Sequence, residues 1–189
     1  MSKSFFTVGI GASAGGQASL CEFFDHLSEN LNVVFVVATH LMRDKKSVLS
    51  NILSRHTKMP VIGVKEDLAV SPGCVYVLIE NTFIELEDGW LRIKPRDNKI
   101  QNSAVDIFFN SLADQCKEQS IGIILSGGGQ DGLQGAIRIN KMGGIVLAED
   151  PESAQFNGMP LSIAEHDHPV AMKKPAELAK YINRLCALV

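Results

Sequence analysis

The chain has 189 residues, of which 46% are hydrophobic, and its 18 basic and 21 acidic residues give a formal net charge of −3. This length and composition predict a single domain over residues 1–189 with a well-buried core. Without long runs of like charge, the sequence lacks the electrostatic signature of a protein that binds nucleic acid or an anionic membrane. Protein or small-molecule partners are therefore favoured.

The cysteines and the amino-terminal segment indicate the cellular compartment. Four cysteines are widely spaced, and none forms a Cys-x-x-Cys pair, which argues against a zinc site, a redox pair or a disulfide framework. The first apolar stretch is too short for the core of a signal peptide, and no run approaches the roughly 18 apolar residues of a membrane span. We therefore predict a cytoplasmic protein with reduced cysteines and no membrane insertion.

The first third of the chain alternates strands and helices. The apolar runs 5–10 and 33–38 are typical of strands that are buried on both faces of a parallel sheet. Between them, hydrophobic residues recur at helical spacing from Leu20 to Leu27 and predict a helix that packs on this sheet. A second helix is predicted from about Asp44, before a short strand at 61–64.

The hydrophobic period then changes to two between Cys74 and Lys94. Short strands are predicted at residues 74–79, 83–86 and 90–93. The turn dipeptides Glu80-Asn81 and Asp88-Gly89 separate them, which favours a small antiparallel insertion.

The remaining chain returns to alternating helices and strands. Ser103-x-x-Asp106 resembles a capping box and predicts the start of a helix. Predicted elements follow as a strand at 121–125, a helix that ends at Met142, a strand at 145–148 and a helix from Pro175. This order predicts a doubly wound α/β fold, with a mostly parallel sheet, helices on both of its faces and a small antiparallel hairpin insertion.

A serine lies in a glycine-flanked turn directly after the first strand, in Gly11-Ala12-Ser13-Ala14-Gly15. Such a strand-to-helix turn exposes the serine hydroxyl at the carboxyl end of the strand, as in the nucleophile elbow of serine hydrolases. The same segment also reads as Gly-x-Gly-x-x-Ala, which is close to the dinucleotide-binding fingerprint. The motif alone therefore leaves a hydrolase and a nucleotide-binding domain open.

Polar residues follow three of the predicted parallel strands: Ser13, His40 and Asp131. Because ligands bind at the carboxyl edge of open α/β sheets, these side chains predict a triad of nucleophile, base and orienting carboxylate. A dinucleotide-binding fold usually has an acidic residue near the end of its second strand, and residues 31–40 contain none. This difference favours the hydrolase.

The oxyanion formed by serine attack needs backbone N–H donors. We expect them from Ala14 and from the glycine loop that contains Gly128 and Gly129. Asp106 is assigned only to the first turn of its helix, where a carboxylate interacts favourably with the helix dipole. The segment His166-x-His168 is interpreted as a solvent-facing polar loop, because it lacks further spaced metal ligands.

The sequence resembles the catalytic domain of the chemotaxis protein-glutamate methylesterase (CheB) family along essentially its whole length. The matching segments are Gly11 to Gly16, His40, Val105-Asp106, Gly127 to Gly132 and Gly158-Met159-Pro160. The resemblance implies hydrolysis of glutamate methyl esters on the cytoplasmic helices of chemoreceptors, with deamidation of glutamine at equivalent sites. It also implies a Ser13-His40-Asp131 triad that works without a metal or cofactor, and it places Met159 near the site.

Several positions depart from the pattern of that family. Ala14 replaces the usual threonine, Leu41-Met42 replaces Met-Pro, Gly128 stands where methionine is common, and residues 99–102 lack the usual arginines. These departures motivate a second hypothesis, a catalytically silent module that still binds receptors. The amino-terminal receiver domain of many family members is also expected to be lacking, which predicts regulation by a separate protein.

Overall fold

The computed structural model describes residues 5–39, 47–96 and 103–187, and within them two sheets. The larger sheet contains β1 (Phe6–Ala12), β2 (Val33–Thr39), β3 (Val61–Val64), β5 (Cys74–Leu78), β8 (Ser120–Ile124), β9 (Ile145–Glu149) and β10 (Ala171–Lys173). Its order is β10-β9-β8-β1-β2-β5-β3, and its described pairings are all parallel. The smaller, antiparallel sheet has the order β4-β7-β6, from β4 (Leu68–Ala69), β6 (Thr82–Glu87) and β7 (Trp90–Pro95).

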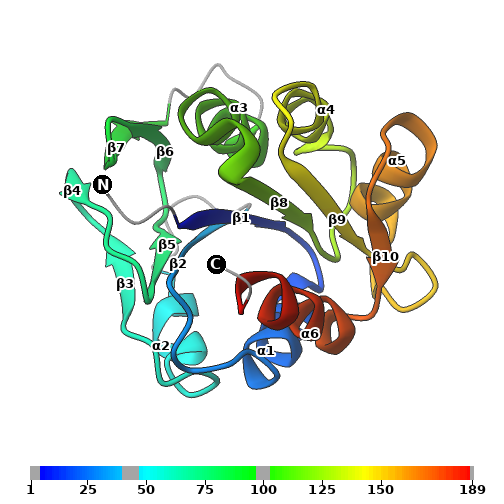
Figure 1. Cartoon of the computed structure of the whole chain (residues 1–189), viewed down its shortest axis with the longest axis horizontal. Coiled ribbons are helices and arrows are strands. Elements are labelled where there is room, and N and C mark those ends of the chain that lie inside the picture. Colours follow the sequence, from blue (N-terminus) through cyan, green and yellow to red (C-terminus); the bar gives the residue numbers. More distant parts are fainter. Residues whose placement is uncertain (1–4, 40–46, 97–102, 188–189) are drawn as a thin grey trace.

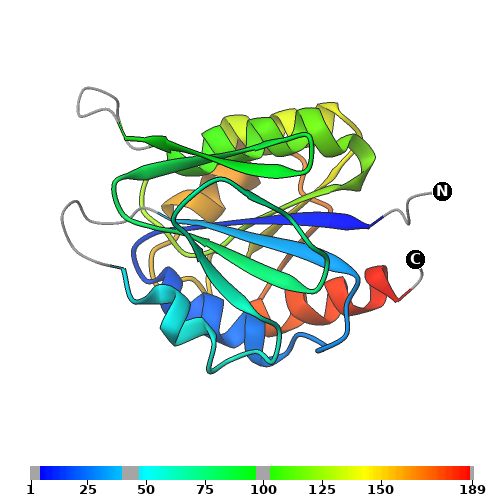
Figure 2. The ribbon, with the colours of Figure 1, turned by 90° about the vertical axis from the view of Figure 1, so that its left-hand side faces the viewer.

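Helices cover both faces of the larger sheet (Figure 1). On one face lie α3 (Ala104–Cys116), which a short 3-10 turn at Lys117–Gln119 follows, and α4 (Leu133–Lys141). The other face carries α1 (Gly16–Asp25), α2 (Leu49–Leu53) and α6 (Pro175–Cys186). Figure 2 shows these two helical layers above and below the sheet, with the antiparallel strands in front. The remaining α-helix, α5 (Gly158–His166), contacts α4 and β9.

The residues of β2 explain why both faces need helices. All seven of its residues are buried. Val34 and Val36 belong to the hydrophobic cluster that includes α3, whereas Val33 and Phe35 belong to the cluster that includes α1 and α6. Because successive side chains of a strand point to opposite faces, a continuous apolar run buries both faces only when each is covered.

Glycines in β1 allow α3 to lie directly on the sheet. A Cβ atom at Gly11 would lie 2.4 Å from Cγ1 of Val105, and one at Gly9 would lie 2.8 Å from Cε1 of Phe109. Real Cβ atoms do not approach other atoms so closely. The helix that carries Val105 therefore depends on the absence of side chains at these two positions.

We expect Gly11→Ala to lower the free energy of unfolding by about 1–3 kcal/mol, because overpacking forces α3 away from β1. Urea unfolding followed by circular dichroism measures this change. Gly63→Ala in β3 is the matched control, since a Cβ there would meet its nearest neighbour at an ordinary 3.5 Å. Equal stability of the two variants would contradict the expectation.

The predicted fold class is confirmed, but several elements differ from the sequence prediction. The stretch 74–79 was assigned to the antiparallel insertion, and that assignment is wrong: β5 pairs in parallel with β2 and β3. The hairpin itself is correct, and its Asp88-Gly89 turn has positive φ angles of 49° and 77°, as a tight two-residue turn requires. Helix α2 begins at Leu49, later than predicted, and residues 40–46 lie outside the described ranges.

The strand order also determines where a ligand can bind. The chain passes from β1 to β2 on one side and later reaches β8 on the other side of β1. The carboxyl ends of β1 and β8 therefore form the topological switch point of the sheet, where open α/β folds bind ligands. Ser13 follows β1 directly, and the glycine loop 126–132 follows β8.

Candidate active site

Ser13 lies in a tight turn between β1 and α1. Gly15 adopts a left-handed conformation with a φ angle of 72° and caps α1. A Cβ atom at Gly16 would lie 2.6 Å from Cβ of Ala12, so the turn has no room for a side chain there. The strand-turn-helix arrangement predicted from the glycine pattern is present, with Ser13 half-buried and Ala14 exposed.

The glycine loop after β8 lies against this turn. The N–H of Ser13 donates to the carbonyl of Ser126 at 3.0 Å, which extends the pairing of β1 with β8 beyond the strands. A Cβ atom at Gly127 would lie 3.0 Å from Cβ of Ser13 and 2.1 Å from Sδ of Met159. Met159 is fully buried, and its N–H donates to the carbonyl of Gly127 at 2.8 Å. Met159 therefore supports the loop from inside the protein, while the serine lies beside the loop backbone.

Asp131 and Asp106 each accept hydrogen bonds from the backbone of the other residue's helix or its neighbour: Asp131 binds the first turn of α3, and Asp106 binds the start of α4. Asp131 precedes α4 but accepts hydrogen bonds from the first turn of α3, from Val105 N–H at 3.0 Å and Asp106 N–H at 2.9 Å. Asp106 lies in α3 but accepts from Gly135 N–H of α4 at 2.8 Å. The predicted capping box does not form, because the Asp106 N–H that Ser103 would cap donates to Asp131 instead. These contacts fix the buried Asp131 carboxylate in one orientation.

The surroundings of Asp106 shift the pKa of its carboxyl group. Burial raises the pKa of Asp106 above its ordinary value, and the adjacent Asp131 raises it further, against the lowering effect of the Gly135 N–H. Asp106 therefore retains its proton to a higher pH than an exposed aspartate would. Sequence analysis assigned this residue to the helix start alone, since nothing local to it indicates a second carboxylate 25 residues later.

This pKa shift predicts a pH-dependent stability difference for Asp106→Asn. Between the unfolded pKa of about 3.9 and the raised folded value, Asp106 binds more protons in the native state, so its contribution to the wild-type free energy of unfolding falls as the pH rises. An asparagine does not titrate. The stability of D106N relative to the wild type should therefore increase with pH through this window and then level off. Urea unfolding at a series of pH values measures it, with the exposed Asp114→Asn as control; a flat difference for D106N would contradict the expectation.

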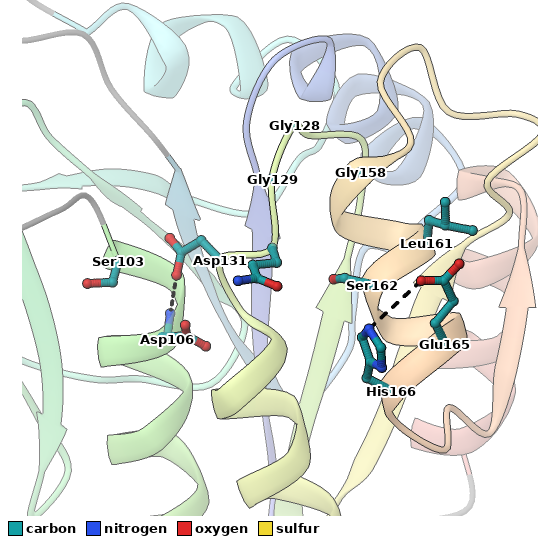
Figure 3. A pocket seen from close by; sticks show the side chains of 11 residues that line it. Ser103, Asp106, Gly128, Gly129, Asp131, Gly158, Leu161, Ser162, Glu165 and His166 are labelled. Carbon is teal, nitrogen blue, oxygen red and sulfur yellow. Dashed lines mark hydrogen bonds and ion pairs between the residues drawn. The ribbon is translucent and has the colours of Figure 1, made fainter.

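A cleft of about 760 Å³ opens beside the glycine loop (Figure 3). Its walls come from the start of α3, from residues 128–131 and from α5. The side chains of α5 that line it are Leu161, Ser162, Glu165 and His166, and the last two approach each other to 3.8 Å. The cleft thus extends from the carboxyl groups of Asp106 and Asp131 to the glycine loop.

The structure places the predicted site residues as follows. Gly128, Gly129 and Asp131 line the cleft, and among residues 5–39, 47–96 and 103–187 no atom lies within 4 Å of a Cβ built at Gly128. Ser13 is adjacent to the same loop through Gly127. His40 lies outside the described residues. Ala12 precedes Ser13 and Thr39 precedes His40, and these two preceding residues are paired across β1 and β2.

Two buried residues at this edge were not predicted. Ser126 donates its N–H to Oε2 of Glu149 at 2.8 Å, and both side chains are almost inaccessible to solvent. Burial raises the pKa of Glu149, outweighing the lowering effects of hydrogen bonds from Ser19 and Ser126. The sequence feature that could have indicated Glu149 is its position: it is a charged residue directly after the apolar run 145–148, at the carboxyl edge of the sheet where Ser13 and Asp131 also lie.

Neither a metal centre nor a membrane span is found among the described residues. In the ranges that the structure covers, no group of three or more His, Cys, Asp or Glu side chains is arranged to hold a metal ion. His166 and His168 are both exposed, as predicted for solvent-facing side chains, but His166 ends helix α5, so only the assignment of this position to a loop was wrong. None of the helices in these ranges is both long and apolar enough to cross a membrane.

Comparison with known proteins identifies the family. The sequence profile described as CheB methylesterase matches residues 8–182. The chain is 35% identical to an uncharacterized 104.1 kDa protein of Rhodobacter capsulatus, over 60% of this chain and 12% of that protein. It is 30% identical to protein-glutamate methylesterase/protein-glutamine glutaminase 3 of Pseudomonas aeruginosa, over 91% of this chain and 52% of that protein. It therefore spans at most about half of the length of these two relatives.

A solved structure shows the same fold. The crystal structure of the Thermotoga maritima CheB methylesterase catalytic domain superposes with a TM-score of 0.87 and 27% sequence identity. The superposition covers 96% of this chain and 99% of that domain. From the profile match over nearly its whole length and this shared fold, we conclude that the chain belongs to the CheB methylesterase family.

Proposed function

We propose that this protein is a serine hydrolase that removes methyl esters from glutamate side chains of chemoreceptor proteins and deamidates glutamine at equivalent positions. Its membership of the CheB methylesterase family and a relative named protein-glutamate methylesterase/protein-glutamine glutaminase support this activity. The observation that carries the proposal is the Ser13 turn, which is hydrogen-bonded to the glycine loop at the switch point of the sheet. This arrangement puts a nucleophile candidate beside backbone groups that can approach an ester closely.

In the proposed reaction, Ser13 Oγ attacks the ester carbonyl carbon while His40 removes the hydroxyl proton. The negative charge on the carbonyl oxygen is stabilised by the N–H groups of Ala14 and Gly128, with Gly129 shaping the loop. His40 then donates its proton to the departing methoxide, and methanol leaves an acyl-enzyme. Water, deprotonated by His40, attacks the acyl carbon, and His40 returns this proton to Ser13 Oγ as the acyl C–O bond breaks. The glutamic acid that is released loses its proton to solvent. The mechanism assigns no step to a metal or cofactor.

The described geometry supports these roles in two ways. The pairing of Ala12 with Thr39 makes the chain leave two neighbouring strands at the same level, immediately before Ser13 and His40. Asp131 is held by two N–H groups of α3, one on each oxygen. Each carboxylate oxygen has a second lone pair, which leaves capacity to orient a histidine.

The proposed substrate is a glutamate side chain on a receptor helix, and the partner is the methylated cytoplasmic part of a chemoreceptor. A protein substrate suits the open cleft between residues 128–131 and α5, because Gly128 lines it and no side chain of the part of the chain that the structure describes comes within 4 Å of a Cβ built there. The proposed location is accordingly the cytoplasm. We propose that residues 1–189 act as one domain.

Methanol release from methylated cytoplasmic fragments of chemoreceptors tests the proposal. The wild-type protein is expected to release methanol and to be labelled at Ser13 by a fluorophosphonate probe. Fragment binding without methanol release and without labelling would reject the esterase and support the silent receptor-binding module. Stabilisation of the fold by NAD would instead support nucleotide binding, because a ligand that binds only the native state raises its stability.

A further inference from the structure

Glu149 is a buried carboxyl group to which the proposed mechanism gives no role. It ends β9 and is only 2% exposed. Its Oε2 accepts the N–H of Ser126 at 2.8 Å, and the hydroxyl groups of Ser19 and Ser153 also donate to it. Burying a carboxylate is unfavourable unless hydrogen bonds replace its water. Here the replacement comes from three segments: the loop after β8, helix α1 and the segment after β9.

Ser126 connects this carboxyl group to the nucleophile turn. Its carbonyl accepts the N–H of Ser13 at 3.0 Å, and its hydroxyl donates to the carbonyl of Ala14 at 2.9 Å. The same hydroxyl accepts the N–H of Phe156 at 3.0 Å. Ser126 is fully buried, and its N–H, carbonyl and hydroxyl are all engaged. One residue therefore holds the backbone on both sides of the Ser13–Ala14 peptide.

Packing leaves little freedom around Ser126. A Cβ atom at Gly15 would lie 2.9 Å from Oγ of Ser126, and one at Gly16 would lie 2.9 Å from its carbonyl oxygen. The next residue, Gly127, is enclosed between Ser13 and Met159. A displacement of Ser126 must therefore change how the Ser13 turn lies relative to the glycine loop.

We propose that Glu149 and Ser126 are positioning residues: together they fix the Ser13 turn relative to the glycine loop that supplies the oxyanion donors. This inference rests on the proposed esterase function and adds residues that act through others. Glu149 contributes as the acceptor that holds Ser126, and Ser126 holds the turn. The expected consequence is a dependence of kcat on both residues, with little effect on KM, because neither residue lines the cleft.

Two substitutions at Glu149 separate a positioning role from simple filling of space. Glu149→Leu keeps a similar volume but removes every acceptor, so Ser126 N–H loses its partner. Glu149→Gln retains one amide oxygen for Ser126 N–H, and the hydroxyls of Ser19 and Ser153 can rotate to accept from its NH₂ group. We expect E149L to reduce kcat by roughly 10- to 100-fold, as a displacement of about 1 Å does, and E149Q to restore it to within about threefold of the wild type.

Ser126→Ala provides an independent test that leaves Glu149 and the backbone of residue 126 intact. It removes the hydroxyl bonds to Ala14 and Phe156 but keeps the N–H and the carbonyl. We expect a fall in kcat of about tenfold in a folded protein. Glu152→Leu is the matched control for E149L, because Glu152 is exposed on the segment that follows β9 and should leave kcat unchanged.

The experiment measures kcat and KM for methanol release from one methylated receptor fragment, the rate of fluorophosphonate labelling of Ser13, and thermal unfolding of each variant. Slow catalysis and labelling in folded E149L and S126A, with rescue in E149Q, is the expected result. Wild-type kcat in folded E149L, or an E149Q variant as slow as E149L, would overturn the role of Glu149. If E149L does not fold, S126A and E149Q decide, and a fully active S126A overturns the proposal. A wild-type protein that neither releases methanol nor labels at Ser13 rejects the esterase function itself.

Discussion

Replacing Ser13 by alanine is expected to abolish methanol release from methylated receptor fragments, with a loss in kcat on the order of 10⁶-fold for a serine nucleophile that forms an acyl-enzyme. The N–H of Ser13 donates to the carbonyl of Ser126, and its own carbonyl accepts the N–H of Gly16. Those bonds do not involve the side chain, and Ser13 is only half-buried. The variant should therefore fold like the wild type.

The measurement compares methanol release by the two proteins at equal concentration, with circular dichroism as the test of folding. Ser54→Ala is the matched control, since the Ser54 hydroxyl donates only to a nearby carbonyl at the end of α2, far along the chain from the turn. It should retain the wild-type rate. Turnover by folded S13A would show that the ester is attacked by another group, and the assignment of the nucleophile would fail.

The sequence predicted those parts of the fold that local patterns determine. Continuous apolar runs identified β1, β2, β8 and β9, and Asp88-Gly89 identified the β6–β7 hairpin. The partners of a strand are not encoded locally, which is why 74–79 was placed in the wrong sheet. Helix α5 was missed because it begins with Gly158-Met159-Pro160, a segment typical of a loop, although Pro is tolerated in the first turn of a helix.

The site shows the same division between local and long-range information. The Ser13 turn was predictable because the glycines around it are needed for the turn itself. Ser126 and Glu149 were missed because their meaning depends on contacts across 23 to 113 residues of sequence, from Glu149 to Ser126 and from Ser126 to Ser13. His40 remains a prediction. The two readings of the glycine pattern were separated by the family match, which no single motif could provide.

Asp131→Asn is expected to produce the second large effect, a fall in kcat of about 10⁴-fold, the loss measured when the orienting aspartate of a serine protease triad becomes asparagine. An amide has one acceptor oxygen and presents an NH₂ group where the second oxygen was. That group would face the N–H of Val105 or Asp106, or the histidine that the carboxylate orients. In either orientation of the amide, its NH₂ group faces another N–H donor, on the backbone of α3 or on the histidine.

The same substitution should also lower the free energy of unfolding by about 1–3 kcal/mol, because a buried N–H at the start of α3 loses its acceptor. Urea unfolding measures this loss separately from kcat. Asp114→Asn is the matched control on α3: its carboxylate pairs with Arg138 at the surface, so its stability change should stay within about 1 kcal/mol and its kcat should not change.

Two roles of one carboxylate can then be distinguished with His40→Ala. If Asp131 contributes to catalysis through His40, D131N should cause no further loss of kcat in the H40A background, because residues that act as one unit are not additive. Its cost in stability should remain in that background, since the capping bonds to Val105 and Asp106 do not depend on the histidine. A D131N protein that is destabilised but retains kcat would restrict Asp131 to capping α3 and remove it from the triad.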